Sequence, residues 1–396
     1  MTSSLLIPTT RTFPSWPVFD EEQIDAVTTV LRSGKVNYWT GEVVREFERE
    51  YAAHLGVQHA VAVYNGTIAL ELIMRALAIG PGDEVIVAPR TYVASASVVL
   101  WAGARPVFAD VDPVSGNITA ETIQAVLTPR TKAVIVVHLG GWPCEMDPIR
   151  QLSDRHGFKI VEDCAQSNCA EYRGRPAGSL GHVAAFSFCQ DKIITTGGEG
   201  GLIATNDSAL WSRLWSLKDH GKSYDAVYNR KHPVGFRWLH EGIGTNGRMT
   251  EMQAAIGRIA LRRLPEWTAR RSENAATYSR ALAGLPAVQL LEPPAHLRHA
   301  YYRFYFQVQA EQLRPDWNRD RILAILTEAG YPCFSGSCCE VYLEKVFAGL
   351  RPPQRLPHAQ ALTGNSLCLL THPTLSTADC AEIGAALRTV LTAASR

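Results

Sequence analysis

Short runs of β-branched residues alternate with helical patterns between about residues 59 and 205, and this alternation limits the possible folds most strongly. Strands that alternate with helices are typical of a parallel sheet with crossover helices. The predicted strands are His59 to Val63, Glu84 to Ala88, Pro106 to Ala109, Ala133 to His138, Phe158 to Glu162, Val183 to Phe188 and Gly201 to Thr205. The sequence therefore predicts an α/β fold on a mostly parallel, seven-stranded sheet flanked by helices.

Helical periodicity also predicts how the chain divides. The predicted helices are Thr67 to Ile79, Tyr92 to Ala102, Ala120 to Leu127, Cys144 to Arg155, Glu251 to Leu264 and Glu266 to Leu282. An aromatic strand, Tyr301 to Val308, and a helix capped by Asn318 follow and indicate a smaller α+β domain. We expect residues 26–265 to form a large domain, residues 266–396 a small one, and residues 1–25 to pack on the small domain.

Composition and charge indicate which kinds of molecule the protein can bind. The 39 Lys and Arg residues nearly balance the 38 Asp and Glu residues, so no overall field attracts the chain to nucleic acid or to a membrane surface. No apolar run approaches the roughly 18 residues of a membrane span. The N-terminus lacks the basic start and apolar stretch of a secretion signal. We therefore expect a cytoplasmic protein that binds small molecules.

The nine cysteines predict neither a disulfide framework nor a metal site. Their number is odd, and a chain of this length has core enough without disulfides. Cys333, Cys338 and Cys339 lie close in sequence, but no paired spacing and no nearby histidine completes a tetrahedral set.

Three polar segments follow strands of the predicted sheet, where open parallel sheets bind their ligands. Asp163 closes one buried strand, Ser187 lies at the end of another with Lys192 after it, and the glycine-rich run from Thr195 to Gly201 comes next. A lysine held among apolar neighbours can form an imine with an aldehyde cofactor, and a buried carboxylate can keep the cofactor's ring nitrogen protonated. Gly66 and Thr67, at the start of a predicted helix, offer amides to a phosphate.

Each of these signals has an ordinary structural explanation when taken singly. An aspartate after a strand is most often a turn or N-cap residue, a single lysine is most often a solvated surface charge, and a glycine-rich run is most often a tight turn. Their occurrence in this order within one predicted sheet is what favours the functional interpretation.

The same order of motifs resembles the DegT/StrS-type (DegT/DnrJ/EryC/StrS) sugar aminotransferases, a branch of the fold-type I enzymes that use pyridoxal phosphate (PLP). The resemblance runs from Ser33-Gly34 to about Leu264. The matching segments include Asn65 to Leu70, Pro81 to Ile86, Gly103 to Asp110, His138 to Gly141, Glu162 to Gln166, Phe186 to Phe188, Gly198 to Gly201, His220-Gly221 and Asn246 to Met249. Asn65 and His182 depart from residues common in the family, at positions that carry no chemistry.

The resemblance implies a role for each matching residue. Lys192 is the lysine that carries the cofactor and moves protons, and Asp163 is the partner of the pyridine nitrogen. Gln166 lies near the phenolic oxygen and Tyr92 stacks on the ring, while the phosphate contacts are Gly66, Thr67 and Ser187. Asn246 reaches the phosphate of the neighbouring subunit, which implies a homodimer with shared active sites. Some relatives are dehydratases with histidine at the lysine position, so Lys192 favours transamination.

The segment between His220 and Asn246 is long for the family and combines basic with aromatic residues. This segment has two interpretations: a solvated loop with aromatic residues packed at a dimer interface, or a clamp that binds an anionic substrate. Arg230 and Arg237 are the candidate anion ligands, and Trp39 and His220 are further candidate substrate residues. A nucleotide-linked keto sugar and a free keto-sugar acid such as 8-keto-3,8-dideoxy-octulosonate both suit such a clamp.

The resemblance thus predicts an aminotransferase that cycles between PLP and pyridoxamine phosphate (PMP). L-glutamate would supply the amino group and a keto sugar would accept it, in the synthesis of surface polysaccharide, lipopolysaccharide or an antibiotic. The alternatives are a PLP-binding regulator without turnover and a PLP dehydratase or epimerase on the same scaffold. The complete set of lysine, aspartate and glycine-rich turn favours turnover, because a regulator need not hold a lysine at the reacting carbon.

Overall fold

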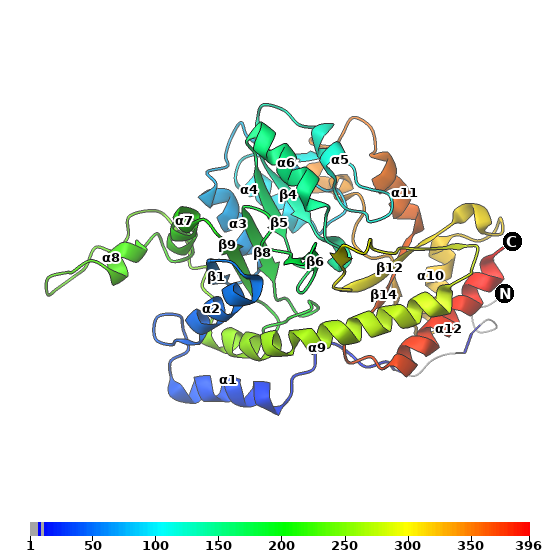
Figure 1. The fold of residues 1–396 in the computed structure, drawn as a ribbon, viewed down its shortest axis with the longest axis horizontal. Coiled ribbons are helices and arrows are strands. Elements are labelled where there is room, and N and C mark those ends of the chain that lie inside the picture. Colours follow the sequence, from blue (N-terminus) through cyan, green and yellow to red (C-terminus); the bar gives the residue numbers. More distant parts are fainter. Residues whose placement is uncertain (1–6, 9–11) are drawn as a thin grey trace.

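A seven-stranded sheet forms the centre of the fold (Figure 1), in the computed structural model that describes residues 7–8 and 12–396. Its strands are β1 (His59–Val63), β2 (Glu84–Val87), β3 (Arg105–Phe108), β4 (Thr131–Val137), β5 (Lys159–Asp163), β8 (Val183–Ser187) and β9 (Gly201–Thr205). The strand order is β1-β9-β8-β5-β4-β2-β3. Within this sheet β9 runs opposite to the other six strands. The α/β prediction and all seven strand positions are confirmed, with ends shifted by a residue or two.

Helices cover both faces of the sheet, because successive side chains of a strand point to opposite faces. Val61 and Val63 pack in one apolar cluster with the helix α3, whereas Ala60 and Ala62 pack in another with α2. The helices around the sheet are α1 (Glu21–Ser33), α2 (Val43–Leu55), α3 (Gly66–Ala76), α4 (Ala94–Trp101), α5 (Ala120–Gln124), α6 (Met146–His156) and α7 (Ser208–Lys218). Strands buried on both faces explain the continuous apolar runs in the sequence.

One long helix, α9 (Glu251–Leu282), replaces the two helices predicted on either side of Pro265. A proline inside a helix removes one backbone hydrogen bond and costs about 3 kcal/mol. The helix continues because it packs along its length against α1, α2 and the C-terminal helix α12 (Thr377–Ala394). It buries Leu264 and Thr268 on either side of the proline. The prediction of a helix boundary at residue 265 was therefore wrong. The division into residues 1–25, 26–265 and 266–396 stays a prediction.

The C-terminal part contains a four-stranded antiparallel sheet in the order β10-β12-β14-β13. Its elements are β10 (Val288–Leu290), β12 (Arg303–Val308), α10 (Arg319–Glu328), β13 (Cys333–Phe334), α11 (Pro357–Asn365), β14 (Ser366–Leu370) and α12 (Thr377–Ala394). A small sheet joins β11 (Leu297–Arg298) to β6 (Glu171–Tyr172) and β7 (Arg175–Pro176). Of the N-terminal segment predicted to pack here, residues 1–6 and 9–11 lie outside the described residues, and Ile7 packs in the C-terminal cluster.

A projection that we call the arm, residues 223–243, extends from the end of α7 away from the rest of the molecule (Figure 1). It begins with the short helix α8 (Tyr224–Tyr228). Four apolar side chains beyond α8 are largely exposed: Val234, Phe236, Trp238 and Ile243. Within residues 7–8 and 12–396, no helix is long and apolar enough to span a lipid bilayer.

Candidate active site

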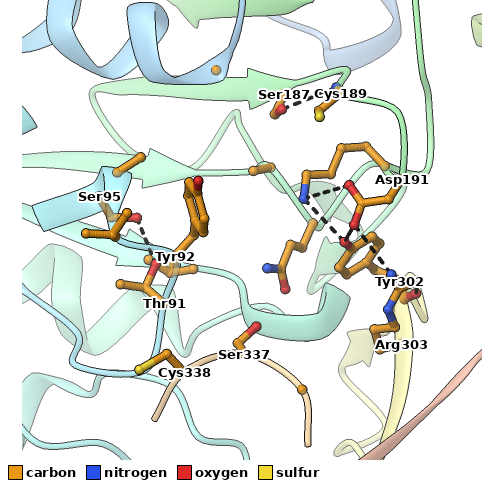
Figure 2. Close-up of a pocket in the computed structure, with 18 of the residues that line it drawn as sticks. Thr91, Tyr92, Ser95, Ser187, Cys189, Asp191, Tyr302, Arg303, Ser337 and Cys338 are labelled. Carbon is orange, nitrogen blue, oxygen red and sulfur yellow. Dashed lines mark hydrogen bonds and ion pairs between the residues drawn. The ribbon is translucent and has the colours of Figure 1, made fainter. Parts of the chain in front are cut away.

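A cavity of about 1170 Å³ lies between the ends of the central strands and the C-terminal part (Figure 2). The wall from the large sheet contains seven of the predicted site residues: Gly66, Thr67, Tyr92, Asp163, Gln166, Ser187 and Lys192. The opposite wall comes from residues 302–305 and 333–338. Parallel pairing of β4, β5 and β8 brings the polar ends of these strands to the same edge, as the sequence predicted.

Lys192 lies in the loop after β8, with its side chain 17% exposed. Its amine nitrogen Nζ is 3.3 Å from the hydroxyl of Tyr302 and 3.3 Å from Oδ1 of Asp191. The indole of Trp16 donates a hydrogen bond of 2.9 Å to the Lys192 carbonyl oxygen, so a residue near the N-terminus holds this loop. The amine therefore faces the cavity from a fixed backbone position.

Asp163 ends β5 and is 6% exposed. Ser95 donates a hydrogen bond of 2.8 Å to its Oδ2, and the backbone amide of Ala165 donates one of 3.1 Å to its Oδ1. Burial raises the pKa of Asp163 above its ordinary value, although these two hydrogen bonds and the charge of Lys192 oppose the rise. A cation bound beside this carboxylate would stabilise its charged form.

The start of α3 forms one end of the cavity, next to Ser187. Asn65 caps the helix through a hydrogen bond of 2.9 Å from the Ile68 amide, which leaves the first amides of the helix available to an anion. A Cβ atom on Gly66 would lie 2.7 Å from the Cβ of Ser187, so only glycine permits this close approach. The Ser187 and Thr67 hydroxyl groups complete a set of donors that suits a phosphate.

Tyr92 and Gln166 also line the cavity. The Tyr92 side chain is 71% exposed, and its ring is open to the cavity in Figure 2. Gln166 accepts a hydrogen bond of 2.7 Å from the Gly140 amide through its Oε1, which leaves its amide nitrogen as a donor. The cavity therefore also offers an aromatic face and a hydrogen-bond donor.

Comparison with known proteins identifies the family. The sequence model of the DegT/DnrJ/EryC1/StrS aminotransferase family matches residues 17–388. The dTDP-3-amino-3,4,6-trideoxy-alpha-D-glucose transaminase of Streptomyces venezuelae is 39% identical, over 88% of this chain and 87% of that protein. The GDP-perosamine synthase of Caulobacter vibrioides is 40% identical, over 89% and 91%. The crystal structure of an aminotransferase from Psychrobacter cryohalolentis is 51% identical, with a TM-score of 0.95 over 96% of this chain and 99% of that one.

This chain belongs to the DegT/DnrJ/EryC1/StrS aminotransferase family. It is a transaminase of the class that includes sugar aminotransferases, and the predicted resemblance is confirmed.

The other predicted site residues of this aminotransferase lie outside the cavity of the described chain: Trp39, His220, Arg230, Arg237 and Asn246. Trp39 packs between Trp215 and the amine of Lys222. His220 and Asn246 are exposed at the base of the arm. Arg230 forms ion pairs of 2.6 Å with Asp225 and with Glu241. The roles predicted for these residues stay predictions.

Several residues of the cavity were not predicted. Asp191 is adjacent to Lys192, and its position beside the lysine was the one available signal. Ser95 comes three positions after Tyr92, and no sequence feature links it to Asp163. Tyr302 and Arg303 come from the C-terminal part, about a hundred positions away, where spacing gives no indication of contact.

A buried group of potential metal ligands lies behind Asp163 and consists of His138, Glu162 and Cys164. The Nε2 of His138 is 2.9 Å from Oε2 of Glu162, and its Nδ1 accepts a hydrogen bond of 3.0 Å from the Cys144 amide. The Glu162 carboxylate also accepts hydrogen bonds from the amides of Gly178, Leu180 and Gly181. These bonds use the ligand atoms of His138 and Glu162, so these two residues are suited to hold the 178–181 turn against the sheet.

Replacement of Glu162 by Leu should strongly destabilise the protein. The change leaves His138 and three backbone amides buried without an acceptor, and we expect the free energy of unfolding to fall by about 3 to 5 kcal/mol. Urea denaturation of the two proteins measures this difference. Glu145→Gln, which breaks the exposed ion pair with His296, is the matched control and should cost less than about 1 kcal/mol. A Glu162→Leu protein as stable as the control would contradict the structural role.

Proposed function

We propose that this aminotransferase transfers an amino group from L-glutamate to a nucleotide-linked keto sugar. We further propose that it uses PLP as cofactor and works as a cytoplasmic homodimer. The proposal rests on one observation above all: a lysine, a buried carboxylate and a helix N-terminus surround the same cavity. L-glutamate as donor rests on the family resemblance, and a nucleotide-linked acceptor agrees with the dTDP- and GDP-sugar names of the two relatives.

The residues of the cavity fit PLP in charge and shape. Burial raises the pKa of Asp163, and a protonated ring nitrogen would be the cation that its carboxylate needs. The amides that begin α3, with the Thr67 and Ser187 hydroxyl groups, would hold the phosphate. The close approach of Gly66 to Ser187 fixes the two sides of this cradle relative to each other.

The protein's own groups would divide the chemistry among them. When bound, PLP supplies an aldehyde carbon that holds the amino group and a ring that withdraws electrons from it. Lys192 would carry the cofactor and, when free, move a proton at the carbon next to the transferred nitrogen. Asp163 would keep the ring nitrogen charged, Tyr92 would cover one ring face, and Gln166 would donate to the phenolic oxygen.

A second subunit would complete the site. Asn246 is exposed and outside the cavity of its own chain, in the position from which family members reach the partner's phosphate. The arm exposes Val234, Phe236 and Trp238, and exposed apolar side chains gathered on one segment are typical of an interface. In a two-fold dimer each subunit would present the same arm to the other.

Borohydride reduction of the PLP-loaded protein tests the central assignment. Reduction fixes the cofactor to the lysine that carries it, and peptide mapping should find the label on Lys192. Lys192→Ala should still bind PLP without a covalent bond but should have no transaminase activity, because only the attachment and the proton carrier are lost. A label on a different lysine would overturn the assignment, and an active Lys192→Ala protein would do the same.

Mixed dimers test the sharing of sites. A Lys192→Ala chain keeps Asn246, and an inactive Asn246→Ala chain keeps Lys192. If the sites are shared, the mixture should regain activity, because each heterodimer then contains one site with both residues intact. Native mass spectrometry confirms that heterodimers have formed. Confirmed heterodimers without activity would refute sharing.

The arm's arginines should contribute unequally to binding of the sugar substrate. Arg237 is exposed and makes no hydrogen bond or ion pair within the described part of the chain, whereas Arg230 is already paired with Asp225 and Glu241. Arg237→Ala should raise the KM for the nucleotide sugar about tenfold or more, as expected for loss of a charged hydrogen bond worth about 1.5 to 3 kcal/mol. Arg230→Ala should raise it less.

Steady-state kinetics with each substrate varied in turn measures these changes. The KM for L-glutamate should stay close to that of the original protein. Lys231→Ala removes a neighbouring exposed cation and is the matched control. An unchanged sugar KM in both arginine variants would leave the arm as a dimer contact that does not bind substrate.

A further inference from the structure

The free amine of Lys192 lies in a small site of its own at the edge of the cavity. Asp191 and Tyr302 each approach Nζ to 3.3 Å, and the Tyr302 hydroxyl in turn donates a hydrogen bond to Oδ2 of Asp191. The amine, the carboxylate and the phenol therefore form a closed ring of contacts. Figure 2 shows these contacts as dashed lines at Asp191 and Tyr302.

Two separate parts of the chain build this site. Asp191 belongs to the lysine's own loop, whereas Tyr302 is 5% exposed and immediately precedes β12 in the C-terminal part. Arg303 lies 3.4 Å from the same Asp191 oxygen that accepts the tyrosine hydrogen bond. Asp191 is thus held from the far wall of the cavity by a phenol and a guanidinium, and its other oxygen, Oδ1, faces the lysine.

This carboxylate is distinct from the one assigned to the cofactor ring. Both oxygens of Asp163 already accept hydrogen bonds, from Ser95 and from the Ala165 amide, and Lys192 makes its ion pair with Asp191. The cavity therefore contains one carboxylate for a ring nitrogen and another for the lysine amine. The second carboxylate would matter whenever the Lys192 amine is free, because a buried cation needs an opposite charge beside it.

We propose that Asp191 and Tyr302 are positioning residues that form a docking site for the freed amine of Lys192. The inference rests on the proposed function, since it takes Lys192 as the lysine that carries PLP. The site keeps the amine at the cavity wall while the amino group resides on the cofactor, so that the lysine can return to the same carbon. Arg303 keeps Asp191 in place during this interval.

The electrostatics of the site agree with this role. Burial alone would lower the pKa of the Lys192 amine, but Tyr302 and Asp191 raise it above its ordinary value. For Asp191 the directions are reversed. Burial alone would raise the pKa of its carboxyl group, but the charges of Lys192 and Arg303 and the hydrogen bond from Tyr302 hold that pKa below its ordinary value. Charged and titratable groups surround the amine from four parts of the chain. They are Asp191 in its own loop, Asp163 in β5, Tyr302 and Arg303 at the start of β12, and Arg271 in α9.

The pH dependence of Lys192 labelling tests the proposal directly. In the protein loaded with PMP the lysine is free, and trace acetylation with acetic anhydride, followed by peptide mass spectrometry, reports how much of its amine is unprotonated. Asp191→Asn should lower the midpoint of this labelling curve by about one pH unit or more, because an opposite charge beside the amine is lost. The exposed Lys345 serves as an internal control and should not change.

A matched variant and a second substitution make the test specific. Glu344→Gln removes another carboxylate that lines the cavity but makes no contact with Lys192, and it should leave the midpoint unchanged. Tyr302→Phe should lower the midpoint less than Asp191→Asn, and it provides the test if the aspartate variant does not fold. The variant with both substitutions should shift the midpoint by less than the sum of the two single shifts, because the two side chains act through one shared hydrogen bond. Additive shifts would contradict a common site.

The outcomes separate this inference from the proposed function. If borohydride labels Lys192 but Asp191→Asn leaves the labelling midpoint unchanged, the docking site is refuted and the proposed function stands. If borohydride labels another lysine, both fall together. A lower midpoint in Asp191→Asn, with the borohydride label still on Lys192, supports both.

Discussion

Parallel pairing of β4, β5 and β8 determines where every polar side chain of the central cavity wall can lie. The three strands end at the same edge, so Val137, Asp163 and Ala185 are direct neighbours across the sheet. Because helices bury both faces, the polar groups that follow these strands can meet a ligand only at this edge. The start of α3 reaches the same place because the glycine at position 66 lets the helix approach Ser187 closely.

Two adjacent carboxylates on β5 show how the same strand can serve structure and chemistry. Side chains alternate across a strand, so Glu162 and Asp163 point to opposite sides. Glu162 is fully buried and accepts hydrogen bonds from His138 and from the amides of the 178–181 turn. Asp163 lines the cavity, and each of its oxygens accepts one hydrogen bond. Glu162 is a structural group, because its carboxylate is used up by the donors around it. Asp163 retains the capacity to pair with a bound cation.

The sequence was sufficient for the sheet and for the cavity wall that the sheet builds. Strand ends and glycine-rich turns are local features, and they correctly brought Asp163, Ser187 and Lys192 together. The opposite wall could not be predicted, because Tyr302 meets Asp191 only through the packing of the C-terminal part. The break predicted at Pro265 failed for a related reason: long-range packing of α9 outweighs the local cost of a proline, and no local pattern reports that packing.

A single chain constrains the side chains of the arm much less than it constrains those of the cavity wall. Much of the cavity wall is constrained by burial, and Asp163, Ser187 and Tyr302 are held by the groups they contact. The side chains of Val234, Phe236 and Trp238 are instead largely exposed within a single chain. In the proposed dimer their environment would belong to the partner subunit, together with that of Arg237. A change of sugar could then be accommodated on the arm without disturbing the lysine, the aspartate or the helix start, because none of these packs against the arm's exposed side chains. Under this proposal, family members with the same cavity would differ in the sugar they accept through a segment that the core does not constrain.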